Sequence, residues 1–298
     1  RGDLGVSTIN LPRVALESKG DKELCWDILE KRMDIVAQAM RFRINQIFGK
    51  AKPEMAPIMY KSGILGHNLK DGESVDSVYN NLRGTISMGY IGLYEVGAVF
   101  FGGEWEKNRE AKQFTIDIIK RMKARCLELS EELDVWASVY ATPSESLTDR
   151  FVRLDLETFG EIENVTDKGY YTNSFHTDVR KKMTPFDKID FEKEYIPHTS
   201  GGFITYVEAP IMKWNLKALE TLWDYSYDRV PYFGVNIPID KCFECGFEGD
   251  FEPTAKGYKC PECGNSNSDT TDVIKRQCGY LGQPQLRPNV KGRKKEID

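Results

Sequence analysis

The stretch RQCGYLGQPQLRP (residues 276–288) places a glycine directly between a cysteine and a tyrosine. A surface turn would account for Gly282 and Pro284, but it does not readily account for the whole stretch. One chemistry requires glycine at such a position: a radical on Cα, stabilised by the flanking amide nitrogen and carbonyl and crowded by any Cβ. Glycine also gives a loop the backbone freedom to leave a pocket and return. Gly279 is therefore either a plain turn residue or a site of radical chemistry.

Two cysteine pairs precede this stretch, CFEC (242–245) and CPEC (260–263), and 14 residues separate them. Thiolates three residues apart in two tight turns can close a tetrahedron around Zn²⁺. Each pair is followed by a glycine, which such a turn needs for its backbone. The predicted zinc ligands are Cys242, Cys245, Cys260 and Cys263. Because thiolates fill all four positions, the zinc is expected to be structural; iron in a rubredoxin-like site is the alternative.

The composition limits the classes of protein to consider. The chain has 298 residues and a net charge of −5, which argues against a nucleic-acid-binding protein. Its seven cysteines and their CxxC spacing fit metal binding in a reducing compartment better than disulfides. No apolar run is long enough to cross a membrane, and no signal peptide is visible. The first residues already look like a strand, so we expect a piece of a longer polypeptide.

Hydrophobic periodicity predicts an α/β fold, because helical and extended segments alternate. The predicted strands cover residues 5–11, 135–141, 201–209 and 232–237, and the predicted helices cover 22–48, 104–133 and 212–224. Residues 84–102 are apolar and glycine-rich, which suggests close-packed buried backbone. Cys25 and Cys126 lie on predicted helices and are expected to be buried core residues. The polar turn at 142–151 follows a buried strand, the usual place for a ligand in such folds.

The tail resembles the fingerprint R-x-[CS]-G-Y of the glycyl radical enzymes, here RQCGY (276–280). More narrowly, the tail and the cysteine pairs resemble the anaerobic (class III) ribonucleoside-triphosphate reductases. The segments TINLPRVAL (8–16), TPSESLTDRF (142–151) and GYYTNSFH (169–176) also resemble that family, in the expected order. Together these segments span nearly the whole chain.

The resemblance implies the C-terminal half of a ten-stranded α/β barrel of the glycyl radical enzyme type, with the radical loop threaded into its centre. Residues 1–240 would belong to the barrel, 241–268 to the zinc ribbon, and 269–298 to the radical loop and a basic tail.

The resemblance also implies a chemistry. A radical stored on Gly279 would be generated by a partner activase that uses S-adenosylmethionine and an iron–sulfur cluster. Ribonucleoside triphosphates would be reduced, with formate as the reductant. Asn10 would line the substrate site, and Glu145 would act as the base on the 3′-hydroxyl. Ser144 and Ser146 would hold substrate hydroxyls or phosphate.

Each assignment has a structural alternative. Asn10 could be an ordinary polar residue at a strand end, and Glu145 could simply favour a helix N-terminus through the dipole. Cys278 could be a plain buried thiol. His176 could contact a ligand or the loop, although a structural role fits it better.

The chain departs from the family in one respect. The cysteine that carries the thiyl radical precedes the TINLPR strand in the family, and no such residue occurs here. A second active-site cysteine and the nucleotide effector site would also lie upstream, so this chain alone should not turn over. The resemblance further implies a homodimer in the cytoplasm, that of the host if a phage encodes it. The alternatives are a glycyl radical enzyme of the formate-lyase type and a non-enzymatic zinc-ribbon binding module.

Overall fold

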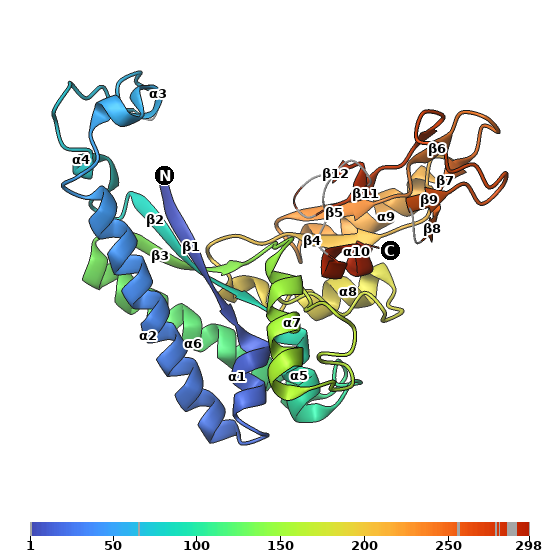
Figure 1. Ribbon diagram of the computed structural model, residues 1–298, viewed down its shortest axis with the longest axis horizontal. Coiled ribbons are helices and arrows are strands. Elements are labelled where there is room, and N and C mark those ends of the chain that lie inside the picture. Colours follow the sequence, from blue (N-terminus) through green and yellow to red (C-terminus); the bar gives the residue numbers. More distant parts are fainter. Residues whose placement is uncertain are drawn as a thin grey trace.

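The computed structural model describes residues 2–64, 66–254, 257–277, 279, 281–284 and 291–297 (Figure 1). Cys278 and Tyr280 of the fingerprint lie outside these ranges.

Parallel strands form the centre of the chain. Strands β1 (Gly2–Asn10), β2 (Gly84–Ile91) and β3 (Trp136–Ala141) pair in parallel in that order. Strands β4 (Thr205–Glu208) and β5 (Phe233–Asn236) form a second parallel pair. A parallel bridge between Tyr140 and Gly202 joins the two sheets just before β4 begins. The five strands thus lie side by side in the order β1 to β5 and form part of an α/β barrel, which we call the half-barrel.

Helices connect these strands. The longer ones are α1 (Leu11–Glu17), α2 (Lys22–Ile47), α5 (Leu93–Phe101), α6 (Arg109–Leu133), α7 (Leu147–Phe159), α8 (Pro185–Glu192) and α9 (Leu216–Tyr227). Shorter elements are α3 (Pro57–Tyr60), α4 (Asp76–Tyr79), α10 (Lys291–Ile297) and the 3₁₀ turns Pro53–Met55 and Ile196–His198. Side chains of Asp21 and Asn108 accept hydrogen bonds from the first turns of α2 and α6, which fixes where these helices begin.

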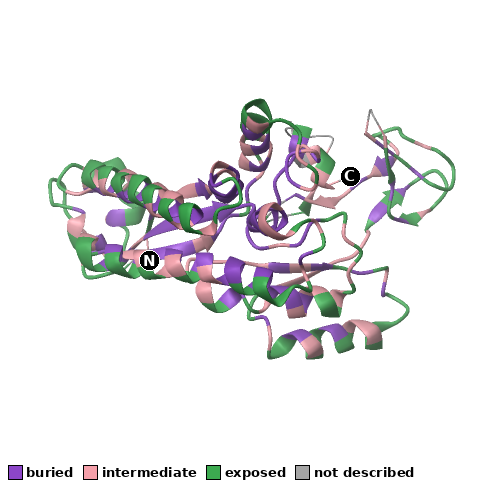
Figure 2. Cartoon of the chain, turned by 90° about the horizontal axis from the view of Figure 1, so that it is seen from below, coloured by how far each residue is buried: buried purple, intermediate pink, exposed green. Residues whose placement is uncertain are grey.

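The two faces of the β1–β2–β3 sheet differ. One face is apolar and packs on α2 and α6, with Ile86, Met88 and Val139 completely buried (Figure 2). The other face carries small and polar residues, since the hydroxyls of Thr8 and Thr142 meet over Gly89 at 3.3 Å. A Cβ on that glycine would lie 2.2 Å from the Thr142 oxygen, so the close approach requires glycine.

Cys25 and Cys126 are buried in the helix layer, which confirms their prediction as core residues. Burial raises the pKa of Cys25 to about 11 and that of Cys126 to about 12. Both side chains therefore stay protonated and act as small apolar groups.

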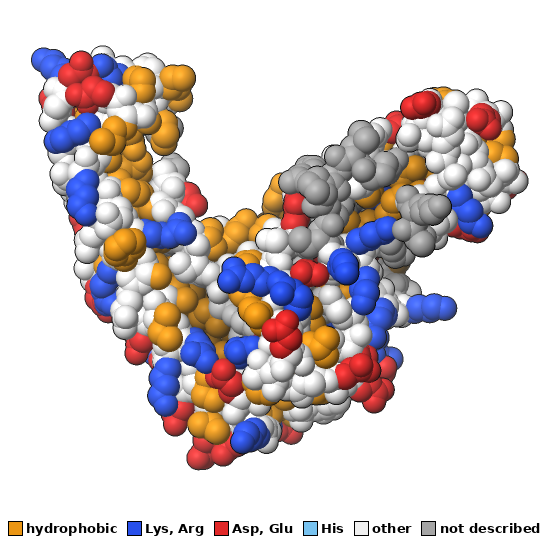
Figure 3. All heavy atoms as spheres, viewed as in Figure 1, with side chains coloured by type: hydrophobic (Ala, Val, Ile, Leu, Met, Phe, Trp, Pro, Cys, Tyr) orange, Lys and Arg blue, Asp and Glu red, His pale blue; other side chains and the backbone are white. Residues whose placement is uncertain are grey.

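The C-terminal part leaves the half-barrel as a separate arm. Strands β6 (Asp240–Cys242), β7 (Glu248–Gly249) and β10 (Thr271–Asp272) form one antiparallel sheet, and β8 (Glu252–Thr254) pairs with β9 (Gly257–Lys259). A hairpin of β11 (Lys275–Arg276) and β12 (Leu281–Gly282) follows, with Gly279 in its turn. This ribbon arm and the opposite arm, formed by α2 and the short α3 and α4, enclose a wide hollow (Figure 3).

Some local predictions were incomplete. The segment 84–102 is a strand and a helix, β2 and α5, separated by Gly92 in a left-handed conformation (φ +78°). The strand predicted over 5–11 ends at Asn10, and helix α1 follows it directly, with Pro12 in the first turn of the helix. The predicted helix 212–224 begins later, at Leu216, where Asn215 caps it. Within the part of the chain that the structure describes, no helix combines the length and apolar character needed to cross a membrane.

Candidate functional site

The C-terminal ends of the parallel strands bring the predicted site segments to one edge. Asn10 ends β1, the loop 144–146 follows β3, and Glu208 and Asn236 end β4 and β5. Active sites of α/β barrels lie at this edge, because the loops after the strands converge there.

Asn10 takes part in a buried polar cluster. Its Oδ1 accepts a hydrogen bond from the Arg13 backbone (3.2 Å), and its Nδ2 donates to Asp155 (3.0 Å). Asp155, on α7, is completely buried and also accepts from the Arg13 guanidinium (2.6 Å) and the Tyr171 hydroxyl (2.7 Å). Two of the segments that carry the family resemblance, 8–16 and 169–176, therefore meet at one carboxylate on α7. The sequence analysis missed Asp155, because an aspartate in an amphipathic helix looks like a surface residue.

The loop that carries Glu145 is fixed by a side chain from the GYYTNSFH segment. Asn173 accepts from the Ser144 backbone N–H (2.7 Å) and donates to the Ser144 carbonyl (3.1 Å). The buried Ser144 hydroxyl accepts a hydrogen bond (2.8 Å) from the N–H of Leu147, the first residue of α7. Glu145 is half-buried and Ser146 is exposed. The backbone on which Glu145 sits is thus held firmly, which is what a positioned base requires.

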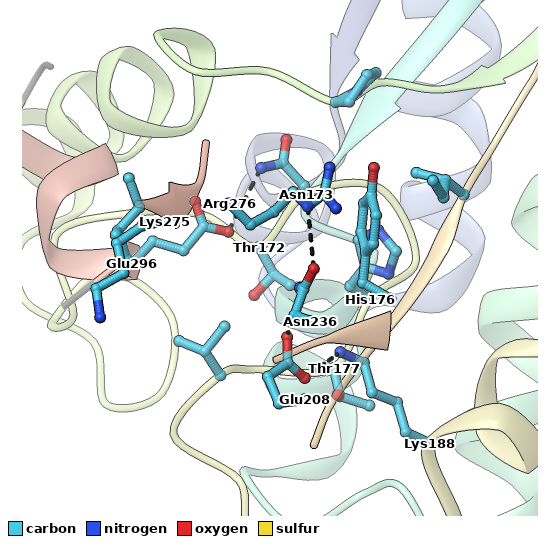
Figure 4. Close-up of a pocket in the computed structure, with 15 residues that line it drawn as sticks. Thr172, Asn173, His176, Thr177, Lys188, Glu208, Asn236, Lys275, Arg276 and Glu296 are labelled. Carbon is cyan, nitrogen blue, oxygen red and sulfur yellow. Dashed lines mark hydrogen bonds and ion pairs between the residues drawn. The ribbon is translucent and has the colours of Figure 1, made fainter. Parts of the chain in front are cut away.

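A cavity of about 250 Å³ lies beside this loop, at the ends of β4 and β5 (Figure 4). Pro143, the segment around His176, the hairpin strand β11 and the end of α10 border it. The residues labelled in Figure 4 are Thr172, Asn173, His176, Thr177, Lys188, Glu208, Asn236, Lys275, Arg276 and Glu296.

Arg276 ties the hairpin to the strand ends. Its guanidinium lies 4.5 Å from the centre of the Tyr206 ring, and its Nε donates to Asn236 Oδ1 (3.0 Å). Asn236 in turn donates to Glu208 (3.4 Å), which pairs with Lys188 (3.2 Å). This chain of contacts places the start of the β11–β12 hairpin at the same edge as the Glu145 loop.

Gly279, three residues after Arg276, is exposed in the hairpin turn. Among the described residues, no atom lies within 4 Å of the position that a Cβ would take. Steric crowding in the described part of the chain therefore does not account for a glycine at this position. The threading of this loop into a closed barrel stays a prediction.

The four predicted zinc ligands come together at the tip of the ribbon. Their sulfur atoms all lie within 4.8 Å of one another, with 3.7 Å between Cys242 and Cys263 and 3.6 Å between Cys245 and Cys260. A tetrahedron with Zn–S bonds of about 2.3 Å has edges of roughly 3.8 Å. A hydrogen bond from the Cys245 backbone lowers the pKa of Cys242 to about 6, which favours the thiolate. The four residues fit a structural zinc ion.

The buried Asp240 joins the ribbon to the hairpin. Its carboxylate accepts from the backbone N–H groups of Phe251 (2.8 Å) and Ile274 (2.9 Å) and pairs with Lys275 (2.7 Å). Lys275 also contacts Asp250. The Asp240 carboxylate therefore connects Phe251, within the ribbon, to Ile274 and Lys275, which follow it. The sequence did not indicate this role for Asp240.

Comparison with known proteins decides the family. The family model described as anaerobic ribonucleoside-triphosphate reductase matches residues 1–298. The chain belongs to this family. The enzyme of that name from Escherichia coli K12 is 48% identical over 298 residues, which are 100% of this chain and 42% of that protein. The enzyme of that name from Enterobacteria phage T4 is 40% identical over 301 residues, which are 100% of this chain and 48% of that protein.

The solved structures agree on the fold. The crystal structure of the anaerobic ribonucleotide reductase from Thermotoga maritima with glycerol in the active site superposes with a TM-score of 0.67. It is 21% identical and covers 94% of this chain and 42% of that one. The reductase family and the α/β fold predicted from the sequence are therefore confirmed. This chain spans less than half the length of these relatives, and the roles of Gly279, Glu145, Asn10, Ser144 and Ser146 stay predictions.

Proposed function

We propose that this chain forms the part of an anaerobic ribonucleoside-triphosphate reductase that stores the radical, on Gly279, and one side of its substrate site. The observation that carries this proposal is the link from Arg276 through Asn236 to the ends of β4 and β5. It holds the fingerprint hairpin at the barrel edge where the Glu145 loop also lies.

In the proposed reaction, an activase with an iron–sulfur cluster and S-adenosylmethionine generates the radical on Gly279. The radical passes to a cysteine outside this chain, and the thiyl removes the 3′-hydrogen of the ribonucleotide. Glu145 takes the proton of the 3′-hydroxyl, the 2′-hydroxyl leaves as water, and formate supplies the reducing equivalents. Ser144 and Ser146 would hold substrate hydroxyls or phosphate. Asn10 would contribute through its remaining Nδ2 hydrogen, since its other contacts are to Arg13 and Asp155.

Zinc, when bound to the four cysteines, would lock the fold of the ribbon and take no part in bond breaking, because four thiolates leave no position for a substrate. We further propose a homodimer, nucleotide effectors bound outside this chain, and a location in the cytoplasm.

The test is anaerobic EPR on the complete reductase after incubation with its activase, S-adenosylmethionine and reductant, with wild type beside Gly279→Ala. We expect a doublet near g = 2 in the wild type and none in the variant, and deoxyribonucleotide formation only in the wild type. Exposure to air should cut the activated wild type at Gly279 and leave the variant intact. A folded, zinc-loaded wild type without a signal would contradict the proposal.

A further inference from the structure

The segment 170–173 is held in place residue by residue, although the proposed reaction uses none of its side chains. Each of these four side chains hydrogen-bonds a different part of the molecule. The contacts are Tyr170 to Asp178 (3.1 Å), Tyr171 to Asp155 (2.7 Å), Thr172 to Glu95 (2.7 Å) and Asn173 to the Ser144 backbone (2.7 and 3.1 Å). All four residues are buried. A buried polar network in which the partners are satisfied makes the backbone between them rigid.

Asn173 holds the residue that precedes the proposed base. Its Oδ1 accepts from the Ser144 N–H, and its Nδ2 donates to the Ser144 carbonyl. Ser144 is buried, and Glu145 is the next residue in the chain. The Ser144 carbonyl belongs to the peptide group that leads into Glu145. The two hydrogen bonds therefore constrain the backbone on both sides of the Ser144 Cα, and with it the direction in which Glu145 leaves the loop.

The residue before Asn173 contacts a buried group of charges. Lys168 lies 2.5 Å from Glu95 and 2.9 Å from Asp178, and all three side chains are at most 1% exposed. We call these three residues the Lys168 cluster. Thr172 donates its hydroxyl (2.7 Å) and its backbone N–H (2.9 Å) to Glu95, and its hydroxyl accepts from Lys168 (3.0 Å). Displacing Thr172 would leave buried charges without hydrogen-bond partners, which is costly.

The backbone of the segment is attached to the end of β2. Asn173 forms an antiparallel bridge with Ile91, the last residue of that strand. The Gly92 N–H donates to the Thr172 carbonyl (2.9 Å), and Glu95 lies in the first turn of α5, directly after β2. Asn173 is therefore fixed to the end of β2, and its side chain carries this position over to the loop that follows β3.

We propose that Asn173 is the positioning residue for Glu145, and that Thr172 and the Lys168 cluster hold Asn173 in place. This inference rests on the proposed function, in which Glu145 takes the proton of the 3′-hydroxyl. A general base must lie within about 2.6–3.2 Å of the group whose proton it accepts. A displacement of about 1 Å can lower a rate by about 10²-fold. Asn173 touches no reacting atom in this scheme and acts through the backbone of Ser144.

The test uses the complete reductase, loaded with radical by its activase, and compares Asn173→Ala with Asn45→Ala. Asn45 lies at an exposed position of α2. The rate of deoxyribonucleotide formation is divided by the number of spins on Gly279, so that a loss of radical is not counted as a loss of rate. We expect Asn173→Ala to lower kcat per spin about 10–10²-fold. KM should change little, because a misplaced base weakens the transition state and not substrate binding. Asn45→Ala should behave as the wild type.

A double-mutant cycle with Glu145→Gln separates positioning from general structural support. Glu145→Gln alone should lower kcat per spin about 10²–10⁴-fold. In that background, Asn173→Ala should have less than about a threefold further effect, because residues that act as a unit are not additive. Asn173→Asp keeps an acceptor for the Ser144 N–H, so it should recover part of the rate that Asn173→Ala loses. Thr172→Val keeps the side-chain shape and the backbone N–H, and we expect a smaller loss that also disappears with Glu145→Gln.

The proposal is overturned if Asn173→Ala keeps kcat per spin within about threefold of the wild type. It is also overturned if Asn173→Ala lowers the rate by the same factor with and without Glu145→Gln, since the loss would then not pass through Glu145. If Asn173→Ala does not fold, Asn173→Asp and Thr172→Val are subjected to the same two comparisons. A different result marks failure of the proposed function: Glu145→Gln would keep the wild-type rate per spin, or the wild type would carry no radical on Gly279, and this inference would fall with it.

Discussion

The β1–β2–β3 sheet buries Ile86, Met88 and Val139 completely against two long helices. The ribbon's own apolar core has, among the residues that the structure describes, five buried side chains, two of them cysteines. The half-barrel is thus stabilised mainly by burial of apolar surface, at about 25 cal/mol per Å². The ribbon buries little apolar surface, so we expect its fold to depend on a metal at the four cysteines and on a few buried polar contacts. The two regions should therefore respond to different perturbations.

Loss of zinc should have the largest effect, and it should be confined to the ribbon arm. Cys260→Ser removes one of four thiolates, and structural zinc contributes about 10–16 kcal/mol to the folding of small zinc domains. We expect the ribbon to unfold and the radical yield on Gly279 to drop severalfold or more, because Asp240 links the two. Zinc analysis, EPR and hydrogen exchange would show this.

The control is Ser266→Ala, at an exposed ribbon position outside the metal site. The thermal unfolding of the half-barrel should be the same in both variants. An unchanged radical yield in Cys260→Ser would show that the ribbon does not support the loop.

The second experiment perturbs the half-barrel and leaves the ribbon unchanged, by removing a buried polar contact. Asp155→Ala leaves the Arg13 guanidinium and the Tyr171 hydroxyl without their acceptor. Breaking a buried ion pair by removing one partner costs about 3–5 kcal/mol. We expect the free energy of unfolding of the half-barrel to fall by this amount, measured by denaturant titration, while the zinc content stays unchanged.

Glu157→Ala is the matched control on the same helix, because Glu157 is exposed. Its free energy of unfolding should change by less than about 0.5 kcal/mol. Equal destabilisation by the two variants would mean that Asp155 does not hold the segments 8–16 and 169–176 together.

The same contrast explains how much the sequence could predict. Apolar periodicity identified α2 and α6 nearly to their ends, and cysteine spacing identified the metal site, because both patterns are local. The contacts of Asp155 and Asp240 were not predictable in this way. Asp155 meets Asn10 at a separation of 145 residues, and Asp240 meets Lys275 at a separation of 35. A buried carboxylate with distant partners has the same local pattern as an exposed one.

The smallest effect is expected for Asp240→Asn, which tests whether the ribbon and the hairpin are joined by charge or by backbone hydrogen bonds. Asparagine keeps an oxygen for one of the two N–H groups, but it loses the ion pair with Lys275 and one acceptor. We expect a cost of roughly 1–3 kcal/mol, typical of an unsatisfied buried group. Zinc should remain bound, and hydrogen exchange should become faster at Ile274 and in the hairpin.

Asp250→Asn, at the exposed partner of Lys275, should change little, because exposed pairs contribute at most about 1 kcal/mol. If both variants accelerated exchange equally, the charge on Lys275 would be the link; if neither did, the ribbon would support Gly279 by another route than Asp240.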